Sequence, residues 1–414
     1  MAFGIDSNRS AKGTVVNDAR HENFLKWLKK HDFPGTKLRL ATFKDTGRGM
    51  MATDDIATGE VLVQVPKRLL ISSNQLQTVY GDHSLSPHQL LAAHLILLRS
   101  EVNSWWKPYL DLLPNHFKTL PVNFSEEHSA LLPPSLADEI LQQKRKIQDD
   151  FDAVLAFFKG RQDISLIATV TLDMFKWAWL CVNTRSIHVR STSRRVKDCD
   201  IALAPLLDFL NHSNEAQIES GLNLHTQCFE IKTLTPYKAG EQVFINYGPH
   251  DNQAIFREYG FVLPKNGYNF VSVDNEVWKL FEECESIQDA RRKRQILCDS
   301  GYEGDYTVKM NDISYRLVCA LRLLATGPNH RKQIDWQEMI MGHAEHIDDE
   351  NERKVNEMLI TVCSRALADS KQKHELLSTQ GTSIHPLGHL FLNQIWAESI
   401  AILENAVEQS SKCL

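Results

Sequence analysis

Two stretches with β-type patterns, separated by a long helical stretch, constrain the fold of this chain more than any other feature. Residues 38–70 contain short apolar runs broken by two Thr-Gly turns, which is typical of a small antiparallel meander. Residues 86–180 instead carry apolar side chains at three- and four-residue spacing, and strand patterns return in residues 217–247. The sequence therefore predicts an α+β fold in which one β-rich domain is assembled from distant segments around a helical insertion.

The two ends of the chain differ from this region. Residues 1–20 are polar and are expected to form a disordered tail. The β-rich domain with its insertion is predicted to span residues 21–262. After Pro264 the apolar residues follow helical spacing, which predicts an all-α C-terminal domain over residues 263–414.

The composition argues against several classes of protein. The 414 residues carry a net charge of -6, whereas a protein that coats nucleic acid needs a basic surface. The sequence shows neither an apolar run long enough to span a bilayer nor a secretory signal. The eight cysteines lack the close spacing of disulfide frameworks or zinc sites. We expect a soluble monomer of the cytoplasm and nucleus, with no membrane, nucleic-acid or metal partner.

Residues 202–213, Ala-Leu-Ala-Pro-Leu-Leu-Asp-Phe-Leu-Asn-His-Ser, begin apolar and end in three polar side chains, Asp208, Asn211 and His212. Buried polar groups need hydrogen-bond partners, and the amide of Asn211 offers donors and an acceptor that suit the edge of an adenine ring. An Asn-His turn that caps a helix explains the same residues. This segment by itself does not distinguish a ligand-binding site from a helix cap, and both interpretations stay open.

A second polar motif follows an apolar strand. Tyr247 ends the run Val-Phe-Ile-Asn-Tyr and stands directly before Gly248, where the backbone is expected to turn sharply. A tyrosine at a strand end is most often a half-buried aromatic, so Tyr247 alone indicates no activity.

Together, the two motifs resemble the paired C-terminal motifs of the SET domain, whose segments form a pseudoknot around the cofactor. The run Asp-Thr-Gly-Arg-Gly-Met at residues 45–50 resembles the turn that opens a SET domain, and residues 59–66 resemble the strand that follows. The Gly-x-Gly at residues 47–49 precedes a strand rather than a helix, which disfavours a dinucleotide-binding fold. The helical insertion, the run Val-Asn-Thr-Arg at residues 182–185 and the helical C-terminal domain are similar to the Rubisco large-subunit methyltransferase group of this family.

The resemblance implies S-adenosylmethionine as the cofactor and Tyr247 as the catalytic residue. It also implies a substrate channel closed by aromatic side chains, because the cysteine-rich zinc module of many SET enzymes is absent from this sequence. The cofactor-binding residues that it implies are Gly49, Glu60, Leu62, Arg185, Asp208, Asn211, His212 and Tyr247. The channel residues that it implies are Trp179, Phe256, Tyr259 and Phe261.

The implied reaction is methyl transfer to a lysine of a histone or non-histone protein, with the C-terminal domain helping to choose the substrate. Transfer to histidine is an open alternative, because the same group contains enzymes that act on histidine. A catalytically silent binding module is a third hypothesis, although such a module has no chemical need for the full set of site residues. A metal-dependent hydrolase built from His212, His250 and Asp251 is the remaining alternative.

A basic run, Ala-Arg-Arg-Lys-Arg-Gln, occupies residues 290–295. A nuclear import signal or a phosphate contact would use such a run. A solvated helix face is the commoner explanation, and it is the one we favour.

Overall fold

The computed structural model describes residues 12–161, 170–189, 200–380 and 383–412. The chain divides into two compact units, and each unit has a hydrophobic core of its own. The first unit takes the chain up to Val122 together with Ile140–Pro249 and Leu263–Lys265, and the second takes Asn123–Glu139, His250–Val262 and Asn266–Leu414.

This division is more interleaved than a single boundary after residue 262. Residues 123–139, which the helical pattern places in the insertion, belong to the second unit because they pack on its helices. The Trp396 indole N–H, for example, donates to the carbonyl oxygen of Leu131 at 2.9 Å. Contacts of this kind join residues far apart in the chain, so helical periodicity does not reveal them.

A five-stranded sheet in the first unit has the strand order β1, β2, β3, β11, β8. β2 and β3 form an antiparallel hairpin in which Leu38 pairs with Ala52 and Phe43 with Gly47. Gly47 has a φ of +67°, a left-handed conformation that glycine adopts at little cost. The hairpin is the first part of the meander that the sequence predicts. The strands are β1 Thr14–Val15, β2 Leu38–Phe43, β3 Gly47–Ala52, β8 Asn211–His212 and β11 Gln242–Ile245.

Two three-stranded sheets also belong to the first unit. β10 lies between β4 and β9 and is antiparallel to both, and β7 lies in the same way between β5 and β6. Each of these sheets joins segments from before and after the helical insertion, as the two separated β patterns predict. The strands are β4 Val61–Pro66, β5 Ile71–Ser72, β6 Ser186–Val189, β7 Asp200–Leu203, β9 Ile218–Asn223 and β10 Cys228–Thr233.

Part of the predicted tail has defined structure. Residues 1–11 lie outside the described residues, but Thr14 and Val15 form the edge strand β1, with Thr14 opposite Thr42 of β2. Helix α2, Ala19–Lys30, then begins with Asp18 as its N-cap. Two paired residues are too few to produce an alternating pattern, so this strand left no signal in the sequence.

The segment between the two β-rich stretches is helical, as predicted. α4 begins with a capping box, in which the Ser86 hydroxyl accepts from the Gln89 N–H while the Gln89 side chain accepts from the Ser86 N–H. α4 packs against α9, and both helices contribute to the core of the first unit. The elements here are η1 Lys67–Leu69, α3 Ser73–Tyr80, α4 Pro87–Ser100, α5 Lys107–Leu110, η2 Pro121–Asn123, α6 Glu126–Ser129, α7 Pro134–Gly160 and α9 Leu172–Arg185.

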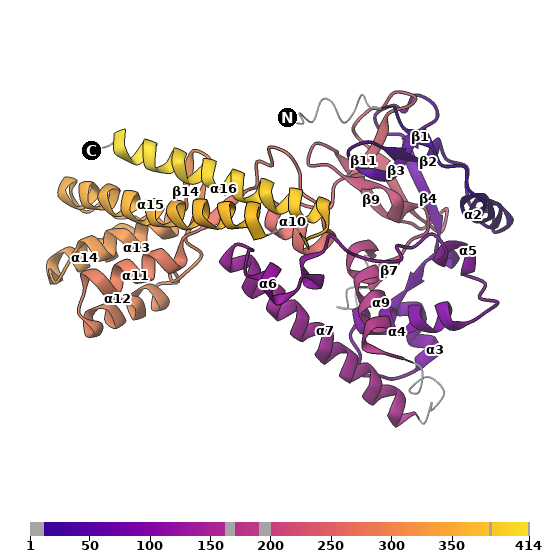
Figure 1. Cartoon of the computed structure of the whole chain (residues 1–414), viewed down its shortest axis with the longest axis horizontal. Coiled ribbons are helices and arrows are strands. Elements are labelled where there is room, and N and C mark those ends of the chain that lie inside the picture. Colours follow the sequence, from indigo (N-terminus) through magenta and orange to yellow (C-terminus); the bar gives the residue numbers. More distant parts are fainter. Residues whose placement is uncertain (1–11, 162–169, 190–199, 381–382, 413–414) are drawn as a thin grey trace. The chain divides into compact units, whose positions relative to one another are not determined.

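Two long helices organise the second unit. α15 and α16 run side by side (Figure 1), and α13 packs on α15. The unit also contains a small antiparallel sheet of β12, β13 and β14, which periodicity could not predict because each strand has only two or three residues. The elements are α10 Asn252–Tyr259, β12 Phe270–Ser272, α11 Asp274–Cys284, α12 Ile287–Asp299, β13 Thr307–Lys309, β14 Asp312–Ile313, α13 Tyr315–Ala325, α14 His330–Ile340, α15 Asp349–Gln380 and α16 Pro386–Lys412.

No helix in the described ranges has both the length and the apolar composition needed to cross a membrane.

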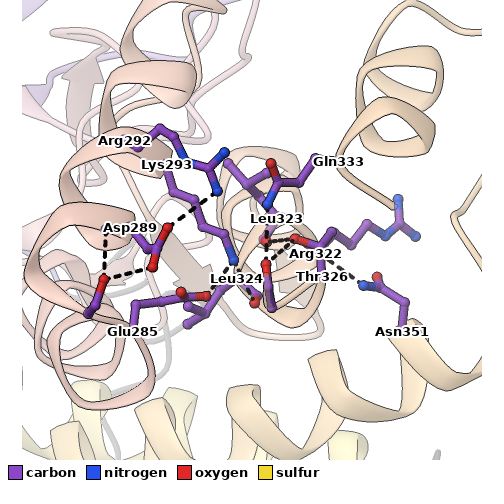
Figure 2. A network of polar contacts seen from close by, with 12 residues as sticks. Glu285, Asp289, Arg292, Lys293, Arg322, Leu323, Leu324, Thr326, Gln333 and Asn351 are labelled. Carbon is purple, nitrogen blue, oxygen red and sulfur yellow. Dashed lines mark hydrogen bonds and ion pairs between the residues drawn. The ribbon is translucent and has the colours of Figure 1, made fainter. Parts of the chain in front are cut away.

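The basic run at residues 290–295 lies on α12, and one of its residues is buried. Lys293 is completely buried, and its ammonium donates to the carboxylate of Glu285 and to a backbone carbonyl of α13 (Figure 2). Arg292 and Arg294 each pair with a carboxylate of the same unit. Lys293 therefore has a structural role, whereas Arg291 and Arg294 lie exposed on α12, as a solvated helix face predicts.

Replacing Lys293 with methionine is expected to lower the free energy of unfolding by about 3–5 kcal/mol, because Glu285 would remain as a buried carboxylate without its partner. Denaturant titration followed by circular dichroism measures this change. Arg291→Met is the matched control, since it makes a similar change at an exposed position of the same helix. The control is expected to change stability by less than about 0.5 kcal/mol. Equal stability of the two variants would contradict a structural role for the ion pair.

Candidate active site

The polar run at residues 202–213 folds into three short pieces. After β7, the 3₁₀ turn η3 covers Leu207–Phe209, and β8 holds Asn211 and His212. β8 pairs with β11 in parallel, so Asn211 lies opposite Phe244 and His212 opposite Ile245. This pairing brings together the two polar motifs that the sequence shows far apart.

Tyr247 follows β11 and is fixed against the β8 segment at three points. Its backbone N–H donates to Nδ1 of His212 at 3.0 Å, and its ring stacks on the imidazole with the centroids 4.9 Å apart. Its hydroxyl donates to the carbonyl oxygen of Leu210 at 2.7 Å. Because Nδ1 of His212 accepts a hydrogen bond, the proton of the neutral imidazole lies on Nε2.

Asn211 reaches from β8 to the backbone of β3. Its side-chain Nδ2 donates to the carbonyl oxygen of Arg48 at 2.9 Å. A Cβ built on Gly49 would lie 2.8 Å from this nitrogen and would collide with Nε2 of Gln242. A side chain larger than hydrogen at Gly49 would therefore push both amides out of place.

Gln242 is a residue of this group that the sequence analysis missed. Its side chain is buried, and its Oε1 accepts from the Thr46 hydroxyl at 2.8 Å. Its Nε2 has no hydrogen-bond partner among the described residues. A buried donor left without a partner costs about 1–3 kcal/mol, so this amide is suited to receive a ligand oxygen or nitrogen. The only signal in the sequence was a polar residue at the start of an apolar strand.

Asp208 and Arg185 form a buried ion pair. Nη1 of Arg185 lies 3.3 Å from Oδ2 of Asp208 and donates to the Asp208 carbonyl oxygen at 2.9 Å. Burial raises the pKa of Asp208 even though the guanidinium of Arg185 opposes the shift. Burial acts to lower the pKa of Arg185, but the charge of Asp208 and other nearby groups raise it overall.

This ion pair has hydrogen-bonding capacity left over. Oδ1 of Asp208 and Nε of Arg185 are both buried and have no hydrogen-bond partner within the described part of the chain. Buried polar atoms are nearly always paired in folded proteins, so these two atoms make the ion pair a candidate place for a polar ligand.

Tyr109 is a second residue that the sequence analysis missed. It comes from α5 of the helical insertion, and its hydroxyl donates to Oδ2 of Asp208 at 2.9 Å. The side chain is completely buried, and burial raises the pKa of its phenol well above the ordinary range, so the hydroxyl stays protonated. A lone tyrosine in the segment Trp-Trp-Lys-Pro-Tyr matches no motif and gave no signal.

Three predicted residues of the first unit lie apart from this group in their described contacts. The Glu60 carboxylate pairs with the ammonium of Lys37 at 2.6 Å, and this hydrogen bond lowers the pKa of Glu60. Leu62 is buried in β4. Trp179 is buried in the insertion, where its indole N–H donates to Asp150 at 2.8 Å. Trp179 therefore packs in the core of the first unit.

The other predicted channel residues belong to the second unit. Phe256 lies on α10 and is completely buried, with its ring centroid 6.1 Å from that of Phe124. Tyr259 and Phe261 are half-buried neighbours with centroids 6.1 Å apart. Phe256 thus packs in the core of its unit, whereas Tyr259 and Phe261 keep exposed ring surface.

A metal-dependent hydrolase finds no support in the geometry. Within the ranges that the structure describes, no group of three or more His, Cys, Asp or Glu side chains is arranged to hold a metal ion.

The fold and the paired Asn-His and Tyr motifs define a class of protein. The SET domain family model matches residues 47–248, and the model of the ribosomal lysine N-methyltransferase 2 C-terminal domain matches residues 269–409. The chain belongs to the SET-domain family of S-adenosylmethionine-dependent protein methyltransferases.

Sequence similarity to known proteins covers most of the chain. SET domain-containing protein 4 of Mus musculus is 32% identical over 379 residues, which cover 87% of this chain and 85% of the relative. Ribosomal lysine N-methyltransferase set11 of Schizosaccharomyces pombe is 26% identical over 96% of this chain and 100% of its own length. Actin-histidine N-methyltransferase of Gallus gallus is 28% identical, but the match covers only 63% of this chain and 46% of the relative.

A solved structure has the same fold. The SET domain of LSMT bound to lysine and AdoHcy superposes with a TM-score of 0.70 and covers 95% of this chain and 91% of its own. The sequence identity is 21%, so the likeness shows the fold. The resemblance to the SET family, inferred from the sequence, is confirmed, and the chain shares the fold of LSMT.

The buried polar atoms of the first unit fit the cofactor of this family. S-adenosylmethionine presents an adenine, a ribose, an amino group and a carboxylate, and so needs both donors and acceptors. The site offers the donors Nε2 of Gln242 and Nε of Arg185 and the acceptor Oδ1 of Asp208, none of which has a partner in the described residues. The bare backbone at Gly49 lies beside the first of these.

Replacing Gly49 with alanine is expected to weaken cofactor binding by about tenfold or more, because the new Cβ displaces the amides of Asn211 and Gln242. The overpacking should also cost about 1–3 kcal/mol of stability. Isothermal titration with S-adenosylmethionine and thermal unfolding measure the two effects. Gly221→Ala is the control, since its Cβ would meet nothing within 4 Å. Unchanged affinity in a folded Gly49→Ala variant would remove this residue from the binding site.

Proposed function

We propose that this chain is a protein-lysine N-methyltransferase that transfers a methyl group from S-adenosylmethionine to the side-chain amine of a lysine in a protein substrate. The observation that carries the proposal is the fixed position of Tyr247, with its hydroxyl on the Leu210 carbonyl and its ring on His212. A phenol held in this way, beside a buried ion pair with free hydrogen-bonding atoms, is suited to orient an amine for displacement.

Each residue of the site has a proposed task. Asn211 and His212 hold the adenine through side chain and backbone. Arg185 binds the carboxylate of the cofactor, a role that suits a guanidinium whose Nε is available. Asp208 balances the charge of Arg185, and Gln242 adds one more donor. The bound cofactor supplies a methyl group on a sulfonium, which is already activated for transfer.

The substrate amine must reach its neutral form before it can react. A lysine with an ordinary pKa near 10.4 needs roughly 4.6 kcal/mol to be neutral at pH 7, at about 1.36 kcal/mol per pKa unit. A dry site that carries positive charge lowers this cost, because both conditions disfavour the ammonium. Arg185 supplies such charge from a largely buried position, and Arg48 adds a second positive charge from a more exposed one. Tyr247 then directs the amine along the line of displacement.

Lysine is the better supported acceptor, and a ribosomal protein the better supported substrate. The C-terminal part of the chain matches the ribosomal lysine N-methyltransferase 2 C-terminal domain over residues 269–409. The lysine-specific relative set11 also covers almost the whole chain, whereas the actin-histidine enzyme matches 63% of it. Substrate choice in our proposal lies in the second unit, so similarity there carries more weight. Histones remain a substrate class to be tested alongside ribosomal proteins.

Replacing Tyr247 with phenylalanine is expected to reduce methyl transfer by about 100-fold or more while cofactor affinity changes by less than about threefold. The physical reason is that the change removes one hydroxyl and leaves the stack on His212 in place. Transfer of radiolabel into ribosomal and histone proteins, followed by mass spectrometry of the labelled residue, measures the effect. Tyr80→Phe is the control, because its hydroxyl bonds to His94 within the insertion. Label on histidine would replace the lysine proposal, and no label together with no cofactor binding would favour a silent binding module.

The pH profile offers an independent test of the acceptor. With subsaturating lysine peptide, the transfer rate is expected to rise about tenfold per pH unit between about pH 7 and 9, because the neutral amine is the reactive form. A histidine acceptor, with an ordinary pKa near 6.5, would instead give a plateau above about pH 7. A flat profile in this range would therefore contradict lysine as the acceptor.

A further inference from the structure

The helical insertion contributes a buried residue to the methyltransferase site. We propose that Tyr109 is a positioning residue for cofactor binding: its hydroxyl holds Asp208 as a carboxylate directed at Arg185, which keeps the guanidinium in place for the cofactor. This inference rests on the role proposed above for Arg185. It assigns a task to α5, a helix of four residues for which neither the family motifs nor the sequence patterns give one.

The aromatic packing around Tyr109 fixes the direction in which its hydroxyl points. The side chain is completely buried, with its ring 6.4 Å from that of Phe24 and 6.5 Å from that of Trp106. α2 and α4 both pack against α5, so two other helices hold this part of the insertion. The hydroxyl points at Oδ2 of Asp208 at 2.9 Å, where water cannot replace it because the carboxyl side chain is itself completely buried.

The same segment also holds the second guanidinium of the site. Nη2 of Arg48 donates to the carbonyl oxygen of Leu112 at 3.1 Å, three residues after Tyr109. Arg48 directly precedes Gly49, whose backbone approaches Asn211. Residues 109–112 therefore contact both Asp208 and Arg48, which a purely structural segment would not need to do.

The charges that face Asp208 can be named from each element around it. Arg185 and Cys181 come from α9, Tyr109 from α5 and Arg48 from β3. Burial raises the pKa of Asp208, while Arg185, the Tyr109 hydroxyl and Arg48 all lower it. Cys181 stays neutral at physiological pH, since burial raises the pKa of its thiol to about 12.

The sign of the effect follows from these causes. Without the Tyr109 hydroxyl the carboxylate loses a donor, so the pKa of Asp208 rises further. Asp208 then takes up a proton at a higher pH than in the wild-type chain. Once Asp208 is protonated, Arg185 loses the charge that orients it, and cofactor binding weakens. The defect of Tyr109→Phe should therefore be large at acidic pH and small at alkaline pH.

The test is isothermal titration of the full-length chain with S-adenosylmethionine between about pH 5.5 and 8.5, for wild type, Tyr109→Phe and Tyr80→Phe. Tyr109→Phe is expected to bind within about twofold of wild type at the alkaline end and about tenfold more weakly at the acidic end, the loss typical of a hydrogen bond to a charged group. Tyr80→Phe removes the hydroxyl of another buried tyrosine of the first unit and should follow the wild-type curve. Thermal unfolding at each pH shows whether any variant has lost its fold.

A second variant separates positioning from packing. In an Asp208→Asn background the carboxylate cannot titrate, so adding Tyr109→Phe should produce no pH-dependent loss. A defect of Tyr109→Phe that is equal at all pH values, or that persists with the same pH dependence in the Asp208→Asn background, would overturn the proposal. The readout needs no protein substrate, so failure to methylate lysine leaves it intact. Absence of cofactor binding by the wild-type chain would overturn the proposed function and this inference together.

Discussion

The backbone pairing of β8 with β11 is the contact on which the candidate site depends. Parallel strands cannot be joined by a tight turn, so the chain between His212 and Gln242 must leave the sheet and return. It does so through β9 and β10, which pair with each other and, through β10, with β4. The result is that Tyr247 stacks on a histidine 35 residues earlier in the chain. A register shift of one residue would turn the Asn211 side chain away from the Arg48 carbonyl. The site residues would then no longer lie together.

The sequence predicts those site residues that differ in polarity or size from their immediate neighbours in the chain. Asn211, His212 and Tyr247 stand out because polar side chains end apolar runs, and Gly49 because it follows a turn. Gln242 and Tyr109 act instead through contacts across 196 and 99 residues, which leave no periodic trace. The fold shows the same limit, since the long helices and strands were predicted while β1 and β12 to β14 are too short to give a pattern. Trp179 stays a predicted channel residue, and the structure adds that its indole N–H bonds to Asp150 in the core of the first unit.

The helical insertion is more than a connection between two β-rich stretches. Tyr109 of α5 supplies a hydroxyl to Asp208, and Leu112, two residues after the helix, supplies a carbonyl to Arg48. Two charged groups of the site therefore depend on this short segment. A helix of four residues is not stable alone and takes its shape from packing, here against α2. The geometry of the site is therefore coupled to the N-terminal helix, which itself carries none of the predicted site residues.

Two buried ion pairs in this chain show how structural charge differs from charge that faces a ligand. In the second unit the ammonium of Lys293 bonds to Glu285 and to a backbone carbonyl, so the cost of burying it is offset within the fold. In the first unit the pair of Asp208 and Arg185 is also largely buried, yet each partner keeps a buried atom with no hydrogen bond among the described residues. An unpaired buried polar atom costs stability, so these two atoms are candidates for hydrogen bonds to a ligand. In the function proposed above, the carboxylate and the amino group of the cofactor would supply the two missing partners, which is why we place the site at the incomplete ion pair.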